Sequence, residues 1–147
     1  MSSDLKSRIQ ADLNAARKAR DKDRTLLLST TLSEIRNREI AEGGPVDDAG
    51  VVEVVAKAVK QRREAAEQMG EAGRDELAAR ETREAEMLQA YLPDQLSETE
   101  VRAMVREAIE AGADSIGPVM GRIMPKLKGR FEGKEANRIV REELAKG

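Results

Sequence analysis

Apolar residues recur every three or four positions along most of the chain, which is the spacing of amphipathic helices. Leu5, Ile9 and Leu13 form one such stripe, and Leu28, Leu32 and Ile35 form the next, which Leu26 and Leu27 widen. The pattern predicts helices over residues 3–20, 24–42, about 47–70, 74–92, 97–111, about 115–128 and 133–146.

The run Val51–Val55, taken alone, has the composition of a β-strand. Its apolar pattern continues at helical spacing as far as Met69, which is too long for a strand, so length decides for a helix. The second half of this helix and the middle of the next are strongly polar. Two arrangements fit: the later helix projects partly from the body, or the two form an antiparallel hairpin held by ion pairs.

One predicted helix ends and the next begins within residues 91–97. Pro93 ends the preceding helix because it has no amide hydrogen and disfavours helical geometry in the residue before it. Ser97 and Glu100 have the spacing of a capping box, and Leu96 precedes the cap as a hydrophobic staple. We therefore predict an all-α protein with an N-terminal helical domain, residues 1–93, which contains a long helical hairpin. A small three-helix C-terminal domain, residues 94–147, follows it.

The composition narrows the chemistry. The 147 residues include 37% charged and 1% aromatic residues, which is typical of packed amphipathic helices with an aliphatic core. The absence of cysteine and histidine removes disulfides, thiolate chemistry and the commonest metal ligand. No apolar run is long enough to span a membrane, and the first residues lack a secretory pattern, so we expect a cytoplasmic protein without a membrane partner.

No catalytic constellation emerges from the pattern. The glutamates at 76, 81, 84 and 86 lack the histidines that helical metal sites usually combine with carboxylates, so a solvated or ion-paired face explains them better. The hydroxyl residues at 29–33 lie in an ordinary helix, and no nucleophile elbow or phosphate loop is present. We therefore expect no catalytic residue, no metal and no cofactor.

A basic segment near the C-terminus stands out against a net charge of −2. Residues 122–141 contain seven Lys or Arg against two Glu, a local field that can attract phosphates. Gly117 and Gly121 lower the helix propensity of the same segment by about 1 kcal/mol each relative to Ala. Two explanations stay open: close helix–helix contact beside a solvated basic loop, or backbone approach of a phosphate ligand.

The chain resembles the GatB/YqeY family, and in particular a stand-alone YqeY-like protein. The pieces that carry the resemblance are residues 37–40, 60–65, 73–74, 76–77, 91–96, 116–121, 128–130 and 133–134. The resemblance implies the two helical domains predicted above. It also implies that the small domain is similar to the tail of the B subunit of the glutamine-dependent tRNA amidotransferase, a carbon–nitrogen ligase, where that tail binds tRNA without performing chemistry.

Our first hypothesis is a non-catalytic tRNA-binding accessory module that recognises the RNA by shape and phosphate contacts. Its binding residues are Gly117, Met120, Gly121, Arg122, Lys126, Lys128, Gly129, Arg130, Lys134, Asn137 and Arg138. Phe131 beside them is either a stacking platform for a base or a core anchor.

Two alternatives remain. The first is a protein-interaction module in which the helical hairpin binds a protein partner through Lys60, Arg63, Arg74 and Glu84. The second is an accessory part of a carbon–nitrogen ligase that uses glutamine as the nitrogen donor; the chain is too short for the catalytic core of such an enzyme.

Overall fold

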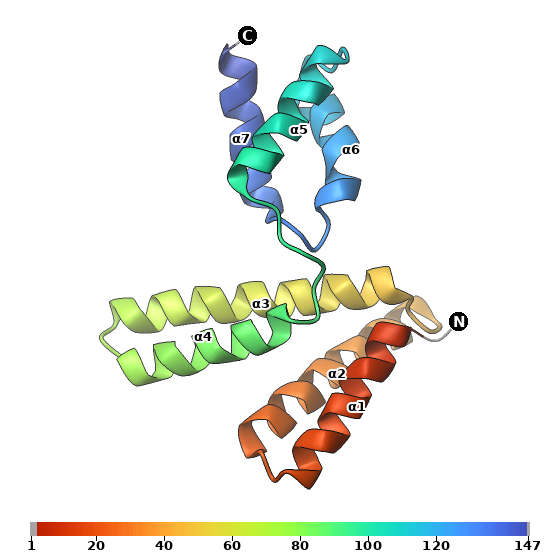
Figure 1. The fold of residues 1–147 in the computed structure, drawn as a ribbon, viewed down its shortest axis with the longest axis vertical. Coiled ribbons are helices and arrows are strands. Elements are labelled where there is room, and N and C mark those ends of the chain that lie inside the picture. Colours follow the sequence, from red (N-terminus) through yellow and green to blue (C-terminus); the bar gives the residue numbers. More distant parts are fainter. Residues whose placement is uncertain (1–2, 147) are drawn as a thin grey trace. The chain divides into compact units, whose positions relative to one another are not determined.

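The computed structural model describes residues 3–146, and every regular element among them is an α-helix, so the predicted all-α class is confirmed (Figure 1). The helices are α1 Asp4–Lys18, α2 Lys22–Glu42, α3 Asp48–Glu71, α4 Asp75–Gln89, α5 Glu98–Glu110, α6 Ile116–Leu127 and α7 Gly133–Lys146. The chain divides into two compact units, one that ends at Leu92 and one that begins at Pro93. Whether these units are independently folding domains with the boundary between residues 93 and 94 stays a prediction.

Short polar side chains begin four of the helices. Ser3, Asp21, Asp47 and Ser97 each accept a hydrogen bond from the amide three residues further on. Such a bond satisfies one of the amides that the first turn of a helix leaves without a partner. At Ser97 the capping bond of the predicted box is present, from the Glu100 amide to the Ser97 hydroxyl at 3.1 Å; the Glu100 carboxylate also reaches back, but it accepts from the Ser97 hydroxyl, at 3.2 Å.

The N-terminal unit consists of two helical hairpins. Within it α1 packs along α2, α3 packs along α4, and the beginning of α3 contacts both α1 and α2 (Figure 1). The core is aliphatic except for Tyr91, and its members are Ile9, Leu13, Leu27, Leu28, Leu32, Ile35, Val46, Val51, Val55, Ala58, Val59, Ala85, Leu88 and Tyr91. All of them except Val46 lie in α1, α2, the first half of α3, or the last part of α4 and the turn that follows it; Val46 lies in the loop between α2 and α3.

Two predictions about this unit are wrong in detail. Leu26 does not widen the buried stripe of α2, since 61% of its surface is exposed; it lies on the side of the helix opposite the core. The helix predicted to reach Leu92 ends at Gln89. The amides of Tyr91 and Leu92 instead bond to carbonyls three residues back, which tightens the chain before Pro93.

Tyr91 joins α4 to the other hairpin. Its ring is buried, its hydroxyl donates a hydrogen bond to the Asp12 carboxylate of α1, and the guanidinium of Arg8 lies 4.9 Å from its ring centre. Burial first, and then the hydrogen bond to Asp12, raise the pKa of Tyr91 to about 12. Tyr91 thereby anchors the C-terminal end of α4 to α1.

The C-terminal unit packs α5, α6 and α7 around a second aliphatic core. Its buried members are Val101, Val105, Ala108, Ala113, Val119, Ile123, Leu127, Ala136, Ile139 and Val140. The segment before α5 is bonded to the loop after α6. The backbone amide of Leu96 donates to the Arg130 carbonyl at 2.9 Å, and the side-chain Nε2 of Gln95 donates to the Gly129 carbonyl at 2.8 Å. These bonds close the three-helix unit at its first residues.

Since Tyr91 is the only tyrosine and tryptophan is absent, ultraviolet absorbance reports its ionisation directly. We expect the phenol to titrate near pH 12 in the folded protein, against 10.0 for an ordinary tyrosine. A raised pKa means that folding favours the neutral phenol, so stability is unaffected below pH 10 and falls as the pH rises from 10 towards 12.

The Asp12→Asn variant separates the two causes, because it removes the carboxylate and leaves the ring buried. Its tyrosine pKa should fall part of the way back towards 10. A wild-type midpoint near 10 in a protein still helical by circular dichroism would contradict the buried, hydrogen-bonded phenol.

Candidate interaction surfaces

The outer half of the α3–α4 hairpin extends beyond the core of its own unit. Val59 is the last buried residue of α3 and Ala85 is the first buried residue of α4, and none of residues 60–84 is buried. At 1.5 Å per residue, α3 continues roughly 18 Å past the core before it ends at Glu71. We call residues 60–84 the arm; Figure 1 shows it as the far end of the paired α3 and α4.

Charged side chains hold the base of the arm together. Arg62 Nε of α3 lies 3.4 Å from Glu84 Oε2 of α4, and both side chains are largely covered, with 15% and 17% of their surfaces exposed. Arg62 also donates to the Ala58 carbonyl at 3.1 Å. On the other side of the same carboxylate, Arg80 Nε lies 3.5 Å from Glu84 Oε1 and extends towards Asp23 of α2, at 3.7 Å.

This arrangement combines the two alternatives that the polar pattern left open. The helices form an antiparallel hairpin held by ion pairs, and that hairpin also projects from the core. The pairs between the two helices join residues far apart in the sequence, so the spacing of charges along one helix did not reveal them.

The tip of the arm is acidic. Between residues 64 and 76 the chain has five exposed carboxylates and a single basic residue, Arg74. The carboxylates belong to Glu64, Glu67, Glu71, Asp75 and Glu76. Leu77, beside them, is 42% exposed. We did not predict this acidic group; a charge count over residues 64–76, which include the facing ends of both predicted helices as well as the loop, would have found it.

The four residues predicted to bind a partner through the hairpin lie in different surroundings. Glu84 is engaged by Arg62 and Arg80, and Arg63 approaches the Gln89 side chain of α4 at 3.5 Å. Lys60 also interacts with other groups of the protein. Arg74 is exposed and precedes α4 at the tip. The predicted set is therefore split between the base and the tip of the arm.

The basic segment of the C-terminal unit is partly neutralised by carboxylates. Arg138 of α7 bonds to Glu98 at 2.7 Å, to Glu135 at 3.0 Å and also to Glu142. The bond from Arg138 is the main reason that the pKa of Glu98 lies below its ordinary value, followed by the bond from Arg102. A guanidinium bound to three carboxylates contributes little positive potential to the surface.

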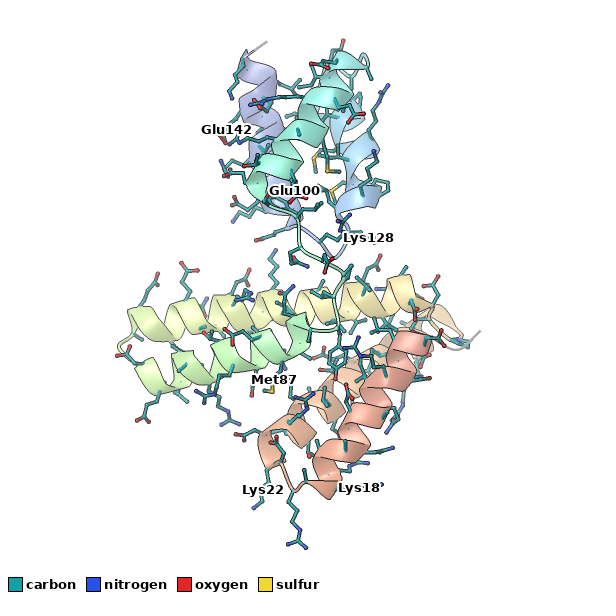
Figure 2. All side chains as sticks on the ribbon, in the orientation of Figure 1. Lys18, Lys22, Met87, Glu100, Lys128 and Glu142 are labelled. Carbon is teal, nitrogen blue, oxygen red and sulfur yellow. The ribbon has the colours of Figure 1, made fainter. Side chains whose placement is uncertain are left out.

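Two further residues of the predicted RNA-binding set serve the fold of the same unit. Arg130 donates from Nε to the Asp94 carbonyl at 3.0 Å, and Gly129 accepts the bond from Gln95. Gly129 also has a positive φ of 74°, which suits a glycine. Lys128, at the end of α6 in Figure 2, interacts with other groups of the protein.

The glycines of α6 do not mediate helix packing. At Gly117 and Gly121 a Cβ atom would meet no neighbour within 4 Å outside the helix itself, so the close-contact explanation is wrong. Met120 packs against the C-terminal core, and Arg122, Lys126 and Lys134 are exposed, with Asn137 half-buried. Phe131 is half-buried against that core, which supports the anchor and not the stacking platform.

A small polar groove lies between α2 and α3. It has a volume of about 360 Å³, and its lining residues are Glu34, Arg38, Glu53, Val54, Lys57 and Gln61. Arg38 bridges it by bonding to Glu53 of α3 and, at 2.9 Å, to Glu42 of its own helix. Two carboxylates and two basic side chains line the groove, so its charges balance and it has no clear preference for an anion or a cation.

Metal and membrane sites are not apparent in residues 3–146. Within that range no three acidic side chains are grouped closely enough to hold a metal ion. None of the described helices combines the length and apolar character needed to cross a bilayer.

The geometry thus defines an all-helical protein with a projecting, acidic-tipped hairpin and a compact three-helix C-terminal unit. The family model described as "Yqey-like protein" matches residues 6–144, and the chain belongs to this family. The YqeY-like part of the predicted resemblance is therefore confirmed.

Several fungal relatives share the name "Altered inheritance of mitochondria protein 41, mitochondrial". The protein from Pyrenophora tritici-repentis is 29% identical over 133 residues, which cover 87% of this chain and 74% of that protein. The one from Eremothecium gossypii is 31% identical over 60% of this chain and 49% of its own length. The one from Saccharomyces cerevisiae strain YJM789 is 29% identical over 71% of this chain and 58% of its own length. The chain therefore spans half to three quarters of these relatives.

These names correct two predictions. The relatives are named for the inheritance of mitochondria, not for tRNA binding or amidotransferase chemistry, so the prediction of a tRNA-binding accessory module is wrong. They are also named as mitochondrial proteins, which overturns the expectation of a cytoplasmic protein. The engagement of Arg138 and Arg130 within the C-terminal unit gives a physical reason why the basic count overestimated the phosphate-binding surface.

The ion pair at the base of the arm predicts a stability effect. Glu84→Gln leaves the Arg62 guanidinium largely covered and without its counter-charge, so the free energy of unfolding should fall by about 1–3 kcal/mol in urea denaturation. Glu86→Gln is the matched control, because Glu86 is exposed on the same helix and its loss should change stability by less than about 0.5 kcal/mol. Equal stability of the two variants would show that the pair does not hold the arm.

Proposed function

We propose that this protein is a protein-binding module whose arm docks a partner protein with a basic surface. The observation that carries the proposal is the arm itself. Residues 60–84 form two paired helices but bury no residue in the core of their unit. Most of the stability of a helix in a protein comes from tertiary packing, so a helix pair that buries none of its residues in a core suits a role in contacts with another molecule.

The chemistry of the tip indicates the kind of partner. The carboxylates of Glu67, Glu71, Asp75 and Glu76 are exposed together, with Leu77 as an apolar contact beside them. Complementary charge steers two proteins into register and suppresses wrong partners. A partner with lysines or arginines around a small apolar depression fits this surface best.

The residues predicted at the hairpin then divide their roles. Arg74 stands at the tip and contacts the partner directly in this proposal. Glu84 acts through the arm, because its ion pairs with Arg62 and Arg80 fix the angle at which α4 leaves the core. Lys60 and Arg63 lie nearer the base and form the edge of the contact.

The C-terminal unit has a separate relation to other proteins. We infer that its three-helix fold is shared with the tail of the amidotransferase B subunit, as the resemblance in sequence suggests. The inference concerns the fold alone; a comparison of an experimental structure of residues 94–147 with that tail tests it.

The proposed function is tested by reversing charge at the tip. A variant with Glu67→Lys and Glu71→Lys changes two exposed residues in the last turns of α3. The control carries Glu107→Lys and Glu110→Lys, two exposed residues in the last turn of α5. Both variants should keep the helical content and thermal midpoint of the wild type, since surface charges away from special contacts change stability little.

Cross-linked partners are captured with the three proteins, and each captured partner is then purified and titrated at two ionic strengths. We expect a partner that the wild type and the control bind, more weakly at the higher ionic strength, and that the tip variant binds about tenfold or more weakly at the lower ionic strength. If every captured protein binds the tip variant as well as the control, the arm is not the docking surface.

A further inference from the structure

One side of α2 exposes an uncharged stripe in a chain that is 37% charged. Its members are Leu26, Thr30, Ser33, Asn37 and Ile40, and all are exposed. They are spaced alternately by four and three residues, which places them along one face of the helix. Leu26 and Ile40, with 61% and 73% of their surfaces exposed, are two of the three large apolar residues that the described chain leaves exposed.

The fold of the monomer does not require this stripe. The core side of α2 is formed by other residues, namely Leu27, Leu28, Thr31, Leu32 and Ile35, all of them buried. A single exposed leucine needs no explanation. Here two large apolar residues lie on one helix face with only uncharged residues between them on that face, so a second molecule can cover the face without removing a charge from water.

The stripe is symmetric about Ser33. Leu26 precedes Ser33 by seven residues and Ile40 follows it by seven, while Thr30 and Asn37 lie three before and four after. If the stripe is turned end over end about Ser33, apolar meets apolar and polar meets polar. A two-fold symmetric interface requires this kind of self-complementary surface.

We propose that two copies of this protein associate through α2, antiparallel, around a two-fold axis at Ser33. Leu26 of each copy then packs against Ile40 of the second copy, and Thr30 lies opposite Asn37 of the second copy. The two Ser33 side chains meet at the axis, where their small size lets the helices approach to about 8–10 Å. No charged side chain of the stripe has to lose water at the contact.

The contact is small, and this sets its strength. A single helix pair buries less than the roughly 1,200–2,000 Å² of a stable interface, so we expect a weak dimer with a dissociation constant on the order of 10–100 µM. The proposal goes beyond the proposed function, since the stripe and the acidic tip of the arm consist of different residues on different helices.

Sedimentation equilibrium of the full chain tests the association, at concentrations from about 5 to about 500 µM, which bracket the expected dissociation constant. The wild type should pass from monomer to dimer. Leu26→Lys alone and Ile40→Glu alone should each raise the dissociation constant at least about tenfold, because each places a charge against an apolar residue. Leu77→Lys is the control: Leu77 is exposed but lies on α4, so dimerisation should be unchanged.

The double variant Leu26→Lys with Ile40→Glu tests the antiparallel register. In the proposed dimer each introduced ammonium faces an introduced carboxylate of the second copy, so association should recover relative to either single variant. In a parallel dimer like charges would meet, and association would be lost further. A wild type that stays monomeric, a dimer insensitive to both single changes, or a double variant without recovery overturns the proposal.

Discussion

The bond between Tyr91 and Asp12 is the contact on which the arrangement of the N-terminal unit depends. α4 packs mainly on α3, and its own buried residues are few: Ala85 and Leu88 within the helix. Tyr91, just after the helix, extends this buried row to α1, where the Asp12 carboxylate accepts a hydrogen bond from its hydroxyl. A large ring removed from water and a satisfied polar tip together fix the end of the hairpin. Because only this end is fixed in the core, the opposite end remains outside it.

Polar contacts replace apolar packing where the hairpin leaves the core. Arg62 is covered enough that it needs a partner, and Glu84 supplies one while also accepting Arg80 from the other side. Such pairs give orientation more than stability, since the loss of hydration offsets much of the attraction. They are therefore suited to an arm that has to hold a direction without adding to a core.

The surface charges of the two units are neutralised to different degrees. In the C-terminal unit Arg138 is bound by three carboxylates, so a segment rich in lysine and arginine presents less positive charge than its composition implies. At the tip of the arm the carboxylates greatly outnumber the single arginine, so that charge faces solvent. The uncharged stripe of α2 is neither acidic nor basic, and it gives the N-terminal unit a second kind of surface.

The sequence by itself determined the local features of this protein. Ser3, Asp47 and Ser97 mark helix starts because a capping bond joins two residues only three positions apart. Pro93 marks the end of the preceding helical segment because a proline acts on the backbone at its own position. The apolar spacing likewise identified core positions of α1 and α2, namely Ile9, Leu13, Leu27, Leu28, Leu32 and Ile35. The resemblance identified the YqeY-like family.

Only the tertiary structure decided which face of each helix is covered and which charges are paired. Leu26 continues an apolar pattern, yet it is exposed because the core of α2 is already filled from the other side. Arg62 and Glu84 are 22 residues apart, and Arg138 and Glu98 are 40 apart, so no local pattern could join them. Pairing and burial depend on which helices lie side by side, and that is a property of the packed chain and not of any one segment.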